Sequence, residues 1–103
     1  MTYRVIFARH AKADLNRLHD YLTERAEYIE DLQIAEQAVD AITSSISALA
    51  STPFLFRKAA RSSFRRELVV PFGSSGYVVE YEIAGPELVV VLAIRHQREE
   101  DYH

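Results

Sequence analysis

The hydrophobic pattern of the chain changes its period near Pro53, and this change limits the folds that the chain can adopt. Between about residues 10 and 25, and again between about 31 and 50, apolar residues recur every three or four positions, as on one face of a helix. The two stripes are Ala11, Leu15, Leu18 and Leu22, and then Ala35, Val39, Ile42, Ile46 and Leu49. The short link between them predicts an antiparallel helical hairpin, with Asp31 as the N-cap of the second helix.

Outside the hairpin the residues follow a period of two, which predicts strands. The segments with this character are residues 3–8, 64–70, 77–83 and 88–94. Pro71 and the following "FGSSG" are expected to break the second strand. The last segment is apolar on both faces, so we expect a central strand rather than a sheet edge.

These elements predict one α+β domain that spans residues 1–103. A first strand and the helical hairpin precede a three-stranded antiparallel meander, and the helices pack on one face of a mostly antiparallel sheet. A chain of 103 residues has room for one core. It contains no cysteine, which excludes disulfides, thiol chemistry and thiolate metal sites.

The formal net charge of -3 conceals a separation of charge along the chain. Residues 14–40 contain only two basic residues, Arg17 and Arg25. The acidic residues of this segment are Asp14, Asp20, Glu24, Glu27, Glu30, Asp31, Glu36 and Asp40. Residues 51–66 invert the balance, with Arg57, Lys58, Arg61, Arg65 and Arg66 and no carboxylate. The basic segment either faces a partner or balances the acidic segment within the molecule.

The last strand is followed by a dense group of polar side chains, "RHQREEDYH". Such a group at the edge of a small domain is a docking surface, a solvated tail or a catalytic site. Arg95 and His96 alternate across the sheet, so one should point inward and the other toward the open face. For His96 a packed, hydrogen-bonded residue and a partner contact both remain open.

No cofactor or metal is expected from the sequence. His10 and Asp14 lie one helical turn apart and could supply two ligands, but no third follows at a recognisable spacing. No glycine-rich phosphate loop is present, and neither helix carries a basic face for DNA. The first residues lack the apolar segment of a signal peptide, and no apolar run approaches a membrane span, so we expect a cytoplasmic protein without membrane contact.

Four segments together resemble the ParE/RelE superfamily of type II toxin-antitoxin toxins. They are "YRVIFARHAKADLNRLHDYL", "RREL", "SGYVVEYEI" and "VVVLAIRHQRE", in this order. The resemblance implies a compact strand-helix-helix-three-strand fold and a hetero-oligomer with a cognate ParD-like antitoxin. It implies binding to operator DNA only through that antitoxin. ParE-like members inhibit DNA gyrase, whereas RelE-like members cleave messenger RNA on the ribosome.

Two departures from the RelE-like pattern favour the ParE-like branch, in which nothing is catalysed. Arg65, Arg98 and approximately Tyr102 match RelE-like positions, but Glu67 and Val78 stand where basic residues are expected. A carboxylate beside a phosphate in the transition state is repulsive. If the chain were a ribonuclease, its catalytic residues would be Arg65, Arg95, His96, Arg98 and Tyr102. A degenerate, non-toxic member that still binds an antitoxin is the third possibility.

Apolar residues at two places should contact a partner rather than the core. Tyr21, Tyr28, Ile29 and Leu32 lie at or beyond the hairpin tip, and Phe54, Leu55 and Phe56 adjoin the basic segment. The predicted partner-binding residues are Tyr21, Tyr28, Leu55, Phe56, Arg57, Arg61, Arg65, Arg66, Arg95, His96, Arg98 and Tyr102. The alternative for Arg65, Arg66 and Arg98 is surface salt bridging with Glu67, Glu80, Glu82 or the acidic tail.

Overall fold

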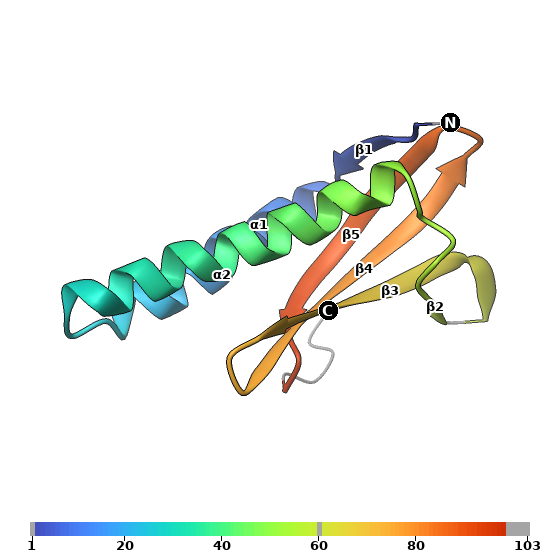
Figure 1. Ribbon diagram of the computed structural model, residues 1–103. Coiled ribbons are helices and arrows are strands. Elements are labelled where there is room, and N and C mark those ends of the chain that lie inside the picture. The colour runs from blue at the N-terminus through green and yellow to red at the C-terminus, as the bar shows by residue number, and fades with distance from the viewer. Residues whose placement is uncertain (1, 60, 99–103) are drawn as a thin grey trace.

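The computed structural model describes residues 2–59 and 61–98, and these form two helices and a five-stranded sheet (Figure 1). The elements in chain order are β1 (Arg4–Phe7), α1 (Arg9–Glu24), α2 (Ile29–Ser47), the 3-10 turn η1 (Ala48–Ala50), β2 (Arg57–Ala59), β3 (Ser62–Phe72), β4 (Ser75–Gly85) and β5 (Leu88–His96). The α+β class, the helical hairpin and the meander of the last three strands are confirmed.

The strands are ordered β1-β5-β4-β3-β2, so β5 lies inside the sheet. β1 pairs with β5 in parallel, with Val5 opposite Val89, and all other pairs are antiparallel. β5 therefore has a hydrogen-bonded strand on each side, which confirms the prediction of a central strand.

β2 was not predicted, because its residues belong to the basic segment that follows α2. β2 has only three residues, two of them the charged Arg57 and Lys58, so no alternation marks it as a strand. It forms because Arg57 pairs with Glu67 and Lys58 with Arg66 on β3. Pairing with a distant strand creates this element, and a local pattern cannot reveal it.

The prediction that Pro71 breaks the second strand was wrong, because β3 continues through it to Phe72. Pro71 pairs with Gly76 on β4. β2 covers β3 only between Ser62 and Glu67, so at Pro71 one edge of β3 has no strand partner and a missing N–H is tolerated. A Cβ at Gly76 would lie 2.2 Å from the Val70 carbonyl oxygen, so this close approach requires glycine.

The start of α2 also differs from the prediction. Its N-cap is Tyr28, and Asp31 lies at the third helical position. The Asp31 Oδ2 atom accepts hydrogen bonds from the backbone N–H groups of Glu27 at 2.9 Å and Tyr28 at 3.1 Å. The carboxylate therefore fixes the turn that leads into α2, and its charge suits the positive end of the helix dipole.

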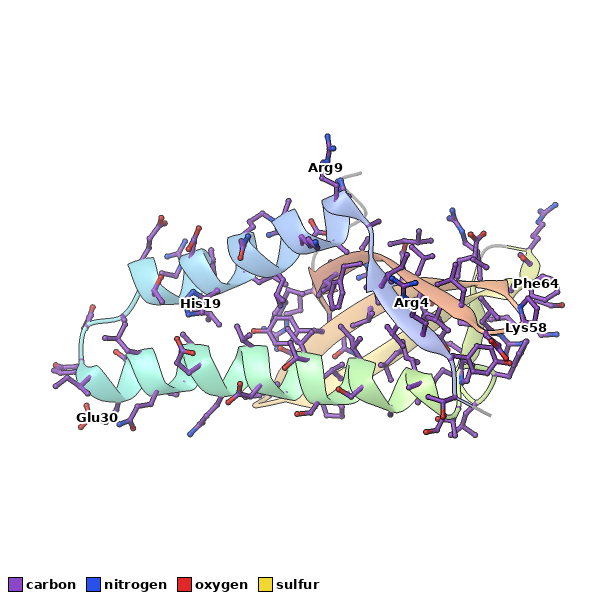
Figure 2. All side chains as sticks on the ribbon, turned by 90° about the horizontal axis from the view of Figure 1, so that it is seen from above. Arg4, Arg9, His19, Glu30, Lys58 and Phe64 are labelled. Atoms are coloured by element: carbon purple, nitrogen blue, oxygen red, sulfur yellow. The ribbon has the colours of Figure 1, made fainter. Side chains whose placement is uncertain are left out.

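The hairpin covers one face of the sheet and buries most of the predicted stripe residues there (Figure 2). In α2 the buried residue at this turn is Ala38, not the predicted Val39. The core joins Ala11 and Leu18 of α1 and Ile42, Ile46 and Leu49 to the side chains of Leu68, Val70, Tyr77, Val79, Tyr81, Ile83, Val89, Val91 and Ile94. Tyr81 is completely buried, and its hydroxyl donates to the Pro53 carbonyl oxygen at 2.6 Å. This bond fastens the segment after α2 to the middle of the sheet.

Asp14 is a buried carboxylate that links α1 to β5. Its side chain is only 5% exposed, and Oδ2 accepts a hydrogen bond from the Ile94 N–H at 2.9 Å. β1 ends at Phe7, opposite Val91, and does not reach Ile94. The carboxylate thus takes the place of a strand partner and holds the C-terminal end of β5 against α1.

We expect Asp14→Ala to lower the free energy of unfolding by about 1–3 kcal/mol, because the buried Ile94 N–H loses its acceptor. Urea denaturation followed by circular dichroism measures the change. The control is Asp40→Ala, since Asp40 is an exposed carboxylate on α2. Equal stability of the two variants would mean that the Asp14 bond contributes nothing.

A second prediction concerns pH. Burial raises the pKa of Tyr81 from 10.0 to about 12, against a smaller opposing effect of the Arg66 charge. The phenol therefore ionises more easily in the unfolded chain. The stability that it contributes is complete below pH 10 and is lost as the pH rises toward 12, at about 1.4 kcal/mol per pH unit.

The measurement is urea denaturation of the wild type and of Tyr81→Phe at pH 7, 10 and 11. At pH 7 the wild type should be more stable by about 1 kcal/mol because of the bond to Pro53. This advantage should shrink or reverse by pH 11. An advantage that is the same at every pH would contradict the raised pKa.

Candidate functional site

Arg95 and His96 end β5 on opposite faces of the sheet. His96 lies opposite Tyr77, whose side chain is in the core, whereas Arg95 lies opposite Val78. The predicted alternation is confirmed, with His96 on the side of the helices and Arg95 on the open face of the sheet.

Both nitrogens of His96 are already engaged. Nδ1 accepts a hydrogen bond from the Arg98 N–H at 3.1 Å, so it carries no proton in this arrangement, and Nε2–H donates to Ser75 Oγ at 3.0 Å. The ring also meets the Tyr77 ring edge-on, with centroids 5.4 Å apart. The geometry favours the packed, hydrogen-bonded interpretation over a proton carrier.

A cavity of about 420 Å³ lies between α1 and the ends of the last two strands. Its lining is Arg17, Leu18, Tyr21, Leu22, Tyr77, His96 and Arg98. Leucine and tyrosine form most of the wall, and two guanidinium groups add positive charge. The cavity brings together the predicted residues Tyr21, His96 and Arg98, and its chemistry suits an apolar side chain that carries or adjoins an anion.

Glu67 organises the open face of the sheet. Its Oε1 lies 3.0 Å from Nε of Arg57, and its Oε2 lies 3.8 Å from Nη2 of Arg95. Salt bridging was the predicted alternative for Arg65, Arg66 and Arg98, but the arginines that lie beside Glu67 are Arg57 and Arg95. A carboxylate, rather than a cationic pocket, occupies the middle of this face.

The conditional ribonuclease residues are not gathered at one place. Arg65 lies opposite Glu82 and Arg95 lies near Glu67, on the same face. Glu82, the partner of Arg65, and Val78, the partner of Arg95, are four residues apart on β4. Arg65 and Arg95 are therefore offset by about 13 Å along the strand direction. His96 is on the other face, Arg98 lies in the turn after β5, and Tyr102 lies outside the described residues.

Arg66 was predicted to bind a partner, and the structure contradicts this. The residue is 9% exposed and lies opposite Tyr81, on the inner face. Its Nε donates to the Ser63 carbonyl oxygen at 2.9 Å, and Nη1 donates to the carbonyl oxygens of Phe54 at 3.2 Å and Phe56 at 2.9 Å. Arg66 is thus a structural residue that ties the segment before β2 to β3.

An aromatic surface, which we call the aromatic shelf, lies at the β2 end of the molecule. It consists of the exposed side chains of Phe54, Leu55 and Phe64. The rings of Phe54 and Phe64 meet edge-on with centroids 6.5 Å apart, and the Arg66 guanidinium lies 5.4 Å from the Phe54 centroid. A groove of about 410 Å³ runs beside them, lined by Tyr3, Phe54, Phe64, Ile83, Ala84, Gly85 and Pro86.

Four cations of the neighbouring segments are exposed: Arg57, Lys58, Arg61 and Arg65. Arg57 and Arg65 lie on the open face of the sheet, whereas Phe64 lies on the inner face with Arg66. Figure 2 shows Lys58 and Phe64 at this same end. Leu55 is exposed as expected, but Phe56 packs partly against the core, so it is not a free anchor. Phe64 was not predicted to contact a partner, because its position near the start of β3 gave no sign that it would face Phe54.

The apolar residues predicted at the other end are also exposed. Tyr21, Tyr28, Ile29 and Leu32 all remain outside the core, and the Arg25 guanidinium lies 4.3 Å from the Tyr21 ring centroid. The molecule therefore presents apolar side chains at both ends of its long axis (Figure 2).

His10 and Asp14 do lie together, with Nε2 3.7 Å from Oδ1, but the other Asp14 oxygen is used by Ile94. Within residues 2–59 and 61–98 no group of three metal-ligating side chains occurs. None of the described helices has the length and apolarity needed to cross a membrane.

Comparisons with known proteins give one consistent result. A model of the family described as "ParE toxin of type II toxin-antitoxin system, parDE" matches residues 5–101. "Toxin RelE3" of Caulobacter vibrioides is 38% identical over 89 residues, which cover 86% of this chain and 88% of that protein. "Toxin RelE1" of the same organism is 32% identical over 90 residues, covering 87% and 89%.

The fold is similar to a chain in a solved structure titled "Chromosomal ParDE TA system from P. aeruginosa". The TM-score is 0.72 at 17% sequence identity, and the match covers 92% of this chain and 96% of the other. At this identity the likeness concerns the fold.

The contrasting environments of two neighbouring arginines give a prediction. Arg66→Ala removes three hydrogen bonds from a charged donor and should lower the free energy of unfolding by about 2–4 kcal/mol. Arg65→Ala, on the exposed face, should change it by no more than about 0.5 kcal/mol. Urea denaturation of both variants measures the difference, and equal losses would contradict the structural role of Arg66.

Proposed function

Because the chain belongs to the ParE toxin family of type II toxin-antitoxin systems, we propose that it inhibits DNA gyrase by contact and thereby blocks replication. On this proposal it is not an enzyme, and a cognate ParD-like antitoxin neutralises it in a hetero-oligomer. It meets its target in the cytoplasm. With a net charge of -3 it reaches operator DNA only through the antitoxin.

The observation that carries the proposal is the state of the residues that RNA cleavage would need. Attack by a 2′-hydroxyl requires a base, an acid and cations close to one phosphate. Here Arg95 faces Glu67, and both nitrogens of His96 are engaged. Arg65 lies about 13 Å along the sheet from Arg95. A site of this kind repels a phosphate at its centre instead of holding it.

The antitoxin contact is supported by the aromatic shelf. Its exposed phenylalanines and leucine lie at the same end of the molecule as the exposed cations Arg57, Lys58, Arg61 and Arg65, which come from the adjoining segments. An apolar surface with a positive rim suits a segment that has apolar anchors and acidic flanks. The structural neighbour comes from a ParDE system, which accords with such a partner.

The second candidate is a ribosome-dependent mRNA endonuclease, because the curated relatives are named RelE3 and RelE1. The cavity lined by Arg17, His96 and Arg98 is the observation that favours it, since its guanidinium groups suit a phosphate. A degenerate member without toxicity is the remaining alternative.

The test applies the purified chain, freed of antitoxin, to gyrase supercoiling of plasmid and to translation on programmed ribosomes. Supercoiling should fall and cleaved DNA should accumulate, because contact poisons gyrase. The mRNA should stay intact when its ends are mapped. Arg98→Ala serves as the matched variant in both assays.

Cut mRNA with normal supercoiling would overturn the proposal. If Arg98→Ala then abolished the cuts, Arg98 would be part of a ribonuclease site. If the wild type affects neither assay, the degenerate alternative holds.

A further inference from the structure

The helical hairpin extends beyond the sheet that it covers. Figure 1 shows the joined ends of α1 and α2 projecting past the strands, and Figure 2 places Glu30 at the far end of the projection. Leu18 and Ala35 are the last buried residues on either helix, and none of residues 19–34 is buried. We call residues 19–34 the hairpin tip.

The hairpin tip exposes large apolar side chains that have no core to enter. Tyr21 is 51% exposed, Tyr28 68%, Ile29 72% and Leu32 45%. Apolar groups gathered on a projection of a monomer commonly mark an interaction surface. Among the described residues, Leu22 packs partly against the core and Tyr21 lines the cavity with Tyr77 and His96. Tyr28, Ile29 and Leu32 remain exposed beyond them, where a partner molecule would bury them.

The charges of the hairpin tip indicate the charge of the surface that it would bind. Its acidic residues are Asp20, Glu24, Glu27, Glu30 and Asp31, and its one basic residue is Arg25. The Arg25 guanidinium lies over the Tyr21 ring at 4.3 Å. An apolar patch with an acidic rim attracts a basic surface with an apolar recess and repels nucleic acid.

The hairpin tip is held in shape by contacts of its own. Asp31 accepts the backbone N–H groups of Glu27 and Tyr28. Across the helices, His19 Nε2 lies 2.8 Å from Glu36 Oε1. A surface already formed in the free protein loses little entropy on binding.

The hairpin tip and the aromatic shelf lie at opposite ends of a molecule 45 Å long. Their rims carry opposite charge, so the acidic segment that suits the shelf is repelled by the tip. Opposite rims of this kind select different partners. The proposed function requires two partners, an antitoxin and a target.

We propose that the hairpin tip is the surface that docks on the target protein, separate from the antitoxin surface at the aromatic shelf. This inference rests on the proposed function. An enzyme that handles DNA presents basic surface to phosphates, which is the chemistry that the acidic rim and apolar centre of the hairpin tip complement. RNA, by contrast, would be repelled.

The experiment compares three variants with the wild type. For each form, binding to purified gyrase and to purified cognate antitoxin is measured, together with inhibition of supercoiling. The tip variant combines Tyr28→Ser, Ile29→Ser and Leu32→Ser, all at exposed positions. The charge variant combines Glu24→Lys and Glu27→Lys and keeps every apolar group. The matched control is Leu55→Ser with Phe64→Ser on the aromatic shelf.

We expect the tip variant to inhibit supercoiling at least about tenfold more weakly than the wild type and to bind antitoxin within about twofold of it. The control variant should bind antitoxin at least about tenfold more weakly and inhibit supercoiling within about twofold of the wild type. The charge variant should bind gyrase more weakly, with a smaller loss of affinity between 50 and 300 mM salt, since fewer ion pairs are screened. Circular dichroism melting confirms that each variant is folded, and the charge variant serves if the tip variant is not.

The outcomes separate the two proposals. A wild type that leaves gyrase unaffected overturns the proposed function and this inference with it. If the wild type inhibits gyrase and the folded tip variant inhibits it equally well, this inference alone is overturned. Loss of antitoxin affinity in the tip variant, with gyrase inhibition retained, overturns it by assigning the hairpin tip to the antitoxin.

Discussion

The apolar layer between the helical hairpin and strands β3, β4 and β5 is the constraint on which the other features depend. Tyr81 lies in this layer, completely buried, with its hydroxyl bonded to Pro53. Because the helices cover one face only, every strand must send alternate side chains into this layer and the others outward. The layer therefore decides which polar residues are available for function and which are committed to structure.

Two pairs of neighbours illustrate this. Arg66 is buried against backbone carbonyls, whereas Arg65 is exposed, and His96 faces the helices, whereas Arg95 faces Glu67. Alternation was predictable from the sequence, but the inner member of each pair was not, because strand register decides it. Once Tyr81 is inside, its partner Arg66 must be inside too. Sequence alone could not rank these arginines as docking residues for that reason.

The features predicted correctly are those with a local signal. Two amphipathic stripes gave the hairpin, and an apolar run gave the interior strand β5. The errors arose where distant pairing decides: β2 exists through its pairing with β3, and Pro71 is tolerated because β2 stops short of it. The role of Asp14, which bonds Ile94 where β1 has ended, likewise had no local signal. The exposed tyrosines Tyr21 and Tyr28 were predictable because they lie off the apolar stripes that face the sheet.

The position of Glu67 connects the fold to the mode of action. In a ribonuclease this part of the open face would need a positive electrostatic potential. Here the Glu67 carboxylate lies between Arg57 and Arg95 and offsets their positive charge. Restoring a cationic site would take more than one substitution, because Arg65 is several residues away along the sheet and His96 faces the other side. The proposed function therefore relies on the surfaces at the two ends of the molecule. If the antitoxin and the target each contact one end, as we propose, neither contact requires movement of the core, and neutralisation and action can be separated on one domain.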